Sequence, residues 1–471
     1  MIAEENASQL TQFRQQVYQN FTKRAGALMN LVDALSSNSR ARSVVELSLE
    51  ACFQREHTSV FKAIANFDPQ AMTKSLAQLA APYLPRPQER DFWLFGVDVT
   101  PQSRPYAFTL KDRGYVYQPT PIKSNKPITI GHPYSSVFCL PERDGQQAVR
   151  TSSATFVIPL GTQRVKSWED KELVGAEQIR ILLEDEEMPF FGQMCAEVED
   201  SSYSKPAYLH ANRSKDNLVT IVRVRSNRTF YQQPPAPPSS GSKGHPTWYG
   251  DAFRLPDPQT WHTPDETVQT TFTSRRGKVY QVLIDGWYDM LMRGKREPAL
   301  IPMQQYPFTL IRIRLFNEKG ELAYRNPMWL IVVGEKRRQL SLRQVFAAYN
   351  QRYDVEHFFR FGKQRLLLAS FQTPDTQHEE HWWLLVHLAY LQLWVARKEA
   401  VSLPRPWERS LPEMKDQPPS PAMVQRDFGR IIRQIGTPAQ VPKRRGNSPG
   451  RPKGTVLARR ERPAVVYKGH T

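Results

Sequence analysis

Polar side chains of the types that bind metal ions and phosphates recur at fixed spacing in YNQRYDVEHFFRFGK, residues 349–363. Because a helix rotates about 100° per residue, a helical segment would bring four of them within an arc of roughly 60°. These four are Tyr349, Arg352, Glu356 and Lys363, with Arg360 nearly on the same line. A carboxylate flanked by cations can hold a divalent ion beside a phosphate. The plainer alternative is a solvated face in which Arg352 and Glu356 form an ordinary i,i+4 pair.

Two acids at the ends of strand-like runs favour the chemical interpretation. Asp98 ends the apolar run FWLFGVD, and Asp200 ends the run MCAEVED. A carboxylate there costs several kcal/mol to desolvate unless positive charge offsets it. Together with Glu356, these acids could share Mg²⁺ ions, which take oxygen ligands and keep phosphate oxygens and waters in their shell. Asp285 in YQVLIDGWY is the alternative second acid, but it lies within the stretch expected to be an insertion.

The composition indicates a polyanionic partner. The chain has 471 residues and a formal net charge of +18, which favours nucleic acid over an anionic membrane. The longest apolar run, WWLLVHLAYLQLWVA at 382–396, is shorter than the ~20 residues that span a bilayer, so a buried helix and no membrane are expected. The opening MIAEENASQL does not read as a signal peptide. Three separated cysteines fit a cytoplasmic protein without a cysteine-based metal site.

Hydrophobic periodicity divides the chain into segments that could position these acids. Residues 7–66 read as helices, and 92–100, 105–111, 126–138, 154–160, 191–200 and 216–231 read as strands around a helix at 170–185. QQPPAPPSSGSKGHP at 232–246 marks a boundary before a β-rich stretch. A further strand at 326–336 precedes a helix that Ser341 and Gln344 would open as a capping box. Residues 401–471 carry 15 Lys and Arg against 5 Asp and Glu, which favours disorder or folding on a partner.

The pattern Tyr349-x2-Arg352-x3-Glu356-x6-Lys363 resembles the Tyr-Arg-Glu-Lys signature of bacterial insertion-sequence DDE transposases. The order of Asp98, Asp200, a β-rich insertion and Glu356 is similar to that of the family. The resemblance implies an α/β fold with an RNase H-like, retroviral-integrase-like catalytic core. The implied units are N-terminal helices at 1–90 for DNA binding or dimerisation, the core in two parts at 91–231 and 329–400, a β-rich insertion at 232–328 and a basic Pro-rich tail at 401–471.

The resemblance also implies the chemistry and the partners. Asp98, Asp200 and Glu356 would hold two Mg²⁺ ions, for which Mn²⁺ could substitute, and Tyr349, Arg352, Arg360 and Lys363 would contact DNA. The protein would bind terminal inverted repeats and target DNA, as a homodimer in a paired-end complex, and catalyse cleavage and strand transfer. It would work in the bacterial cytoplasm, at the nucleoid. A DNA-binding derivative without activity, and an RNase H-like nuclease without strand transfer, are the alternatives.

Three further residues are candidate DNA contacts, each with a structural alternative. Trp329 in MWLIVVGE would stack on a flipped base in relatives that form a hairpin, or it is a core tryptophan. Arg451 and Lys453 in GRPKG are similar to minor-groove hooks, or they belong to a solvated basic tail. His132 in ITIGHPYSS is interpreted as structural.

Overall fold

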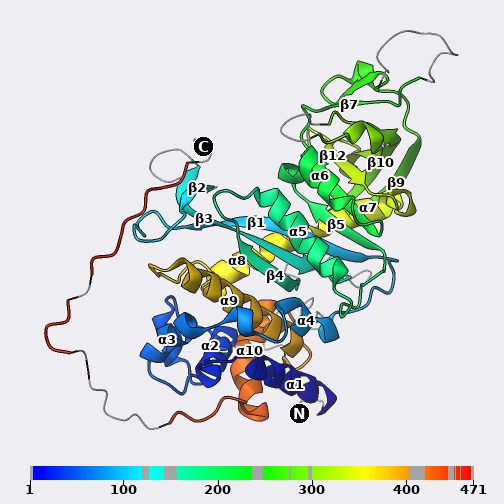
Figure 1. The fold of residues 1–471 in the computed structure, drawn as a ribbon. Helices are drawn as coiled ribbons and strands as arrows, with labels where there is room; N and C mark the ends of the chain where they lie inside the picture. The colour runs from blue at the N-terminus through cyan, green and yellow to red at the C-terminus, as the bar shows by residue number, and fades with distance from the viewer. Residues whose placement is uncertain are drawn as a thin grey trace.

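The computed structural model describes residues 4–118, 127–142, 156–235, 248–274, 277–294, 300–401, 419–443, 450, 452–456 and 458–467. Within them, a mixed sheet of ten strands runs through the molecule in the order β2-β3-β1-β5-β6-β12-β11-β10-β9, and β4 pairs with β3 (Figure 1). The strands are β1 (Trp93–Ser103), β2 (Gly114–Tyr117), β3 (Ile128–Cys139), β4 (Ile158–Arg164), β5 (Cys195–Glu199), β6 (Leu218–Val224), β9 (Glu266–Thr273), β10 (Val279–Met290), β11 (Phe308–Phe316) and β12 (Met328–Val333).

The centre of this sheet is parallel and its two flanks are antiparallel. β1, β5 and β6 run parallel to one another, whereas β3 pairs antiparallel with β1 and β12 pairs antiparallel with β6. Residues 93–97 of β1 are all buried, as expected for a strand covered on both faces. The apolar run FWLFGV thus forms the central strand that its composition predicts.

The β-rich stretch predicted as an insertion extends the same sheet. β11 pairs with β12, β10 with β11 and β9 with β10, all antiparallel. Only β7 (Thr229–Tyr231) and β8 (Ala252–Arg254) form a separate sheet among the described residues. The main sheet therefore continues across the boundaries expected near 231 and 328, and the domain boundaries remain predictions.

Helices cover both faces of the parallel centre. On one face lie α5 (Lys171–Glu184) and α6 (Pro206–Asn212), and on the other lie α8 (Tyr353–Arg365) and α9 (Thr376–Ala396). α7 (Leu342–Gln351) packs on β9, β10 and β5. Ser341 forms the predicted capping box with Gln344 at the start of α7. The prediction of a single helix through residues 349–363 is wrong in one respect, because the chain forms two helices, α7 and α8, that meet at Arg352.

A helical layer packs against α9. It contains α1 (Glu4–Asn20), α2 (Ala25–Ser37), α3 (Thr58–Asn66), α4 (Leu76–Ala80) and α10 (Pro421–Ile435), together with short 3-10 turns at Val45–Leu49, Pro69–Ala71 and Ala81–Tyr83. Buried polar contacts fix α2 against α9, since Gln392 Nε2 donates to Asp33 Oδ1 at 3.1 Å and to Ser36 Oγ at 3.0 Å. No described helix is long and apolar enough to cross a membrane, and α9 is the buried helix predicted from its sequence.

The structure corrects two further predictions. Residues 105–111 form turns rather than a strand. The expectation of disorder in the C-terminal region is wrong for α10, whose Val424, Phe428 and Ile431 are fully buried. Gln425 of α10 also donates to the carbonyl of Leu35 at 3.0 Å. Because the region as a whole carries a net positive charge, its amphipathic helix was not predicted from the sequence.

Candidate active site

Asp98 and Asp200 lie side by side at one edge of the parallel centre. The register of β1 and β5 pairs Gly96 with Val198, so each aspartate lies two residues beyond that pair. Residues two apart on a strand point to the same face, and neighbouring strands are about 4.8 Å apart. Asp98 Oδ1 accepts a hydrogen bond from the Val99 N–H at 2.8 Å. Asp200 Oδ1 accepts one from the Ser202 N–H at 2.7 Å, at the start of the turn Ser201–Tyr203.

A glycine lets α8 approach this face closely. A Cβ on Gly96 would lie only 2.8 Å from Cγ2 of Val355, so the helix rests directly on the β1 backbone. Val355 and Phe358 of α8 are buried against the core, as the helical pattern predicts. Glu356 follows Val355 and is therefore carried to the end of the sheet where the two aspartates lie.

The charges of the three acids are coupled. Burial raises the pKa of Asp98 to about 6; the positive charge of Arg352 opposes this rise, whereas Asp200 and Glu356 add to it. A carboxyl that is buried and has two other acids beside it carries an electrostatic cost that a bound cation would relieve. The pKa shift of Asp98 therefore marks the place where Asp98, Asp200 and Glu356 converge.

Arg352 is the cation at the centre of this group. It donates to Glu356 Oε1 at 2.8 Å, and its side chain is 17% exposed against 40% for Glu356. Burial alone would lower the pKa of Arg352, but Tyr349 and the three acids raise it overall. The i,i+4 pair expected for a solvated face does form, yet it forms beside two further carboxylates.

Two other members of the signature lie near the same acids. Lys363 Nζ donates to Thr100 Oγ1 at 2.8 Å, two residues along β1 from Asp98; burial lowers the pKa of Lys363, and Asp98 opposes that shift. Tyr349 is buried, and burial raises its pKa against the effect of Arg352 and of Arg223 on β6. Arg360 is exposed on α8.

Arg223 was missed by the sequence analysis. It is exposed on β6, and its charge acts on Tyr349. The alternating Arg223-Val224-Arg225 in IVRVRSN could have indicated it, because alternation on a strand places both arginines on one face. These cations surround the acids on the side of the sheet that α7 and α8 cover.

The described residues contain no preassembled group of three potential metal ligands. Their chemistry nevertheless fits a divalent cation: the charges of three carboxylates interact, and burial raises the pKa of Asp98 with a further contribution from Asp200 and Glu356. Glu356 is held by Arg352, so it would have to exchange that partner for an ion. Carboxylate oxygens are the ligands that Mg²⁺ and Mn²⁺ prefer.

Comparison with protein families gives the family to which the chain belongs. A family model described as a DDE superfamily endonuclease matches residues 16–285, more than half of the chain, and one described as a transposase DDE domain matches residues 196–392. The chain belongs to the DDE superfamily of endonucleases. A comparison with curated proteins gave no match. Membership implies a nuclease-type enzyme that acts on DNA, in a family that typically uses divalent metals, and the two matched ranges together include Asp98, Asp200 and Glu356.

In this DDE endonuclease, Asp285 occupies a different environment from Asp200. It is 3% exposed on β10 and pairs with Arg312 at 2.9 Å and Arg314 at 3.1 Å. Thr267 Oγ1 also donates to it. A carboxylate satisfied by two arginines in the sheet extension has a structural role, which favours Asp200 as the second acid.

Trp329 lies in an aromatic cluster of the DDE endonuclease. Its ring is 1% exposed and contacts Phe253, Trp261 and Trp287 with centroids 5.3–6.2 Å apart. No face of the ring is open to a flipped base, so its burial favours the core alternative. His132 is likewise structural: its ring nitrogens contact Glu379 Oε1 at 2.8 Å and the carbonyl of Lys111 at 2.9 Å.

Glu199 is another residue, after Arg223, that the sequence analysis missed. It is fully buried, and neither carboxylate oxygen accepts a hydrogen bond from a described residue. Burial raises its pKa well above the usual range, and Glu197, Asp98 and Asp200 raise it further. By strand alternation Glu199 faces α5, opposite to Asp200, and so lies beneath the candidate site of the DDE endonuclease rather than within it.

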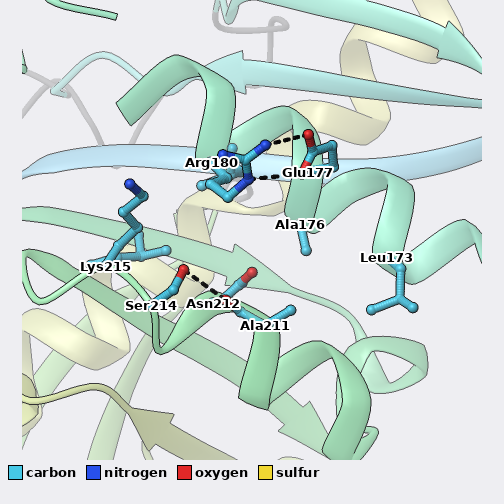
Figure 2. A pocket seen from close by; sticks show the side chains of 10 residues that line it. Leu173, Ala176, Glu177, Arg180, Ala211, Asn212, Ser214 and Lys215 are labelled. Carbon is cyan, nitrogen blue, oxygen red and sulfur yellow. Dashed lines mark hydrogen bonds and ion pairs between the residues drawn. The ribbon is translucent and has the colours of Figure 1, made fainter. Parts of the chain in front are cut away.

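A groove between α5 and α6 lies on that opposite face. Figure 2 shows Arg180 reaching Glu177 near Ala176, with the apolar Leu173 further away along the same wall. The charged residues that line it are paired: Arg180 with Glu177 and with Glu184, and Lys215 with Glu184. None of the three candidate acids lines it. Of the predicted tail contacts, Lys453 is exposed, and Arg451 lies outside the described residues.

Proposed function

We propose that this DDE endonuclease is the transposase of a bacterial insertion sequence, with an RNase H-like core. Its substrates would be the terminal inverted repeats of the element and target DNA, bound by a homodimer in a paired-end complex. The observation that carries the proposal is the coupling of Asp98, Asp200 and Glu356 at one end of the parallel strands. The Tyr-Arg-Glu-Lys spacing along α7 and α8 supports the same conclusion.

Asp98, Asp200 and Glu356 would hold two Mg²⁺ ions. Such a pair activates an attacking hydroxyl and stabilises the leaving oxygen of a phosphodiester. The residues of the chain supply the rest: the two strand ends fix Asp98 and Asp200, and the contact of α8 with Gly96 sets the height of Glu356 above them. Asp98 must be ionised to take part, since a protonated carboxyl is a poor metal ligand.

The surrounding cations would bind and orient the DNA backbone. Arg352 offers a planar, permanently charged donor set suited to phosphate, and it can turn to DNA when Glu356 engages a metal ion. Lys363 and the exposed Arg360 continue this positive face along α8. Phosphate contacts of this kind set position rather than sequence, so the recognition of repeats falls to other surfaces, among which the N-terminal helices are candidates.

Cleavage of a labelled duplex that carries the end of the element tests the function. The purified protein is incubated with the duplex and Mg²⁺, beside the Glu356→Ala variant. Nicking that the variant lacks, together with products joined to target DNA, is the expected result. Binding without cleavage by the unsubstituted protein would indicate a derivative that has lost activity. Cleavage without joining would indicate a nuclease, and either outcome would overturn the assignment as a transposase.

A further inference from the structure

The C-terminal segment of the chain returns to the edge of the main sheet. Figure 1 shows the C-terminus beside β2, far from the end of α10. Val466 forms a parallel bridge with Gly114 of β2, and its N–H donates to the carbonyl of Arg113 at 2.7 Å. The fit is close, because a Cβ on Gly114 would lie 3.3 Å from the carbonyl oxygen of Val466. The tail thus continues the sheet beyond its outermost strand.

Side chains on both sides strengthen this contact. The rings of Tyr115 and Tyr467 lie 5.1 Å apart at an interplanar angle of 64°, and a hydrogen bond between their hydroxyls raises the pKa of Tyr115. The guanidinium of Arg462 lies 5.8 Å from the centroid of Phe108. Phe108 and Tyr115 are still 52% and 57% exposed, so the segment covers an aromatic edge only in part.

The contact is weak enough to be reversible. One backbone hydrogen bond, one aromatic pair and one exposed cation–π contact together give the docked state only a weak stabilisation in water. Closure of the chain between Ile435 and Val466 offsets part of this. Docking is therefore an equilibrium that a ligand of the tail can shift.

The docked tail lies at the end of the positive face that begins at the acids. α8 follows β1 outward, with Val355 over Gly96 and Lys363 bonded to Thr100. β1 pairs with β3, and β3 pairs with β2, where Gly131 lies opposite both Ser103 and Gly114. The sequence ARRE at 458–461, just before the docked residues, presents the exposed Arg459 and Arg460 there.

We propose that the edge of β2 is the docking site of the chain's own segment 462–467. DNA bound at the acids would run outward along the positive face of α8. Docking holds Arg459 and Arg460 where they contact this DNA. The first part stands on the contacts alone, and the second rests on the proposed function.

Disulfide trapping tests the docking without DNA. The Tyr115→Cys/Tyr467→Cys variant should form an intramolecular cross-link under mild oxidation, detected by mass spectrometry of tryptic peptides. The matched control is Tyr117→Cys/Tyr467→Cys, whose first position is also exposed on β2 but lies two residues further along; it should cross-link several-fold more slowly. Equal rates for the two variants, or cross-links formed only between molecules, would overturn the docking.

Salt titration of DNA binding tests the second part. Binding of a labelled duplex of random sequence is measured for the oxidised and the reduced Tyr115→Cys/Tyr467→Cys variant. The oxidised form should bind at least as tightly, and Arg459→Ala/Arg460→Ala in the oxidised form should lower the slope of log K against log salt by about 2. An unchanged slope, or weaker binding after oxidation, would overturn the DNA contact. Absence of Mg²⁺-dependent cleavage by the unsubstituted protein would instead count against the proposed function.

Discussion

Two groups of acids and cations lie along β1 and β3, and they differ in how completely their charges are paired. Glu379 is fully buried and accepts from Arg104 Nε at 2.7 Å and from Tyr134 at 3.0 Å, with His132 at 2.8 Å. Burial would raise its pKa, but His132 and Arg104 outweigh burial and lower it. Asp98 instead has its pKa raised to about 6. The paired acid stabilises the fold, whereas Asp98, which is buried beside two other acids, is the proposed metal ligand.

The largest expected effect is on catalysis at the crowded group. Asp98→Asn keeps the shape of the side chain but removes the charge needed to hold metal, so cleavage of the labelled duplex should fall by about 1,000-fold or more. Binding of the uncleaved duplex, measured by fluorescence anisotropy, should remain within a few-fold of the unsubstituted protein. Equal loss of binding and cleavage would show that Asp98 is structural.

The paired group should respond in the opposite way. Glu379→Gln leaves Arg104 buried without its carboxylate, which should lower the free energy of unfolding by about 3–5 kcal/mol. Cleavage per folded molecule should stay near the normal rate, because Glu379 takes no part in metal binding. Denaturant unfolding followed by tryptophan fluorescence measures the first quantity. A stable Glu379→Gln protein without cleavage activity would reverse the roles assigned to the two groups.

The pH dependence of stability separates the two groups by sign. The measurement is made in EDTA so that no metal ion is bound. The folded-state pKa of Asp98 lies above its unfolded value of 3.8. Ionisation of Asp98 therefore lowers the free energy of unfolding as the pH rises from about 4 to 6. The free energy of unfolding of the Asp98→Asn variant should therefore exceed that of the unsubstituted protein by about 2 kcal/mol at pH 7, after allowance for the partial exposure of the side chain. Below pH 4 the two should be almost equal. The lowered pKa of Glu379 gives stability that is present above its unfolded value of 4.5 and is lost as the pH falls through the folded value. Parallel curves for the two variants would contradict the comparison.

Local patterns in the sequence predicted one of these groups and not the other. The apolar run that ends at Asp98 and the helical spacing around Glu356 are properties of short segments, so β1, α8 and the proposed grouping of the acids could be inferred. The Glu379 group joins residues 247 and 275 positions apart, and no short-range pattern marks such a contact. The break at Arg352 and the extension of the sheet through β12 also depend on tertiary packing, which overrides local propensity.

The smallest expected effect tests whether the position of Glu356, and not only its charge, matters for cleavage. Two glycines provide the test, one at each face of β1. A Cβ on Gly96 would lie 2.8 Å from Val355 on the α8 face, and a Cβ on Gly175 of α5 would lie 2.8 Å from Val97 on the other face. The steric change is matched, but only Gly96→Ala displaces the helix that carries Glu356. Gly96→Ala should slow cleavage by about 10–100-fold, while Gly175→Ala should cleave at a near-normal rate with a similar loss of stability. Thermal unfolding and single-turnover cleavage of both variants measure this difference. If both variants lost cleavage equally, then general loosening of the sheet, rather than the height of α8 above Asp98, would control the activity.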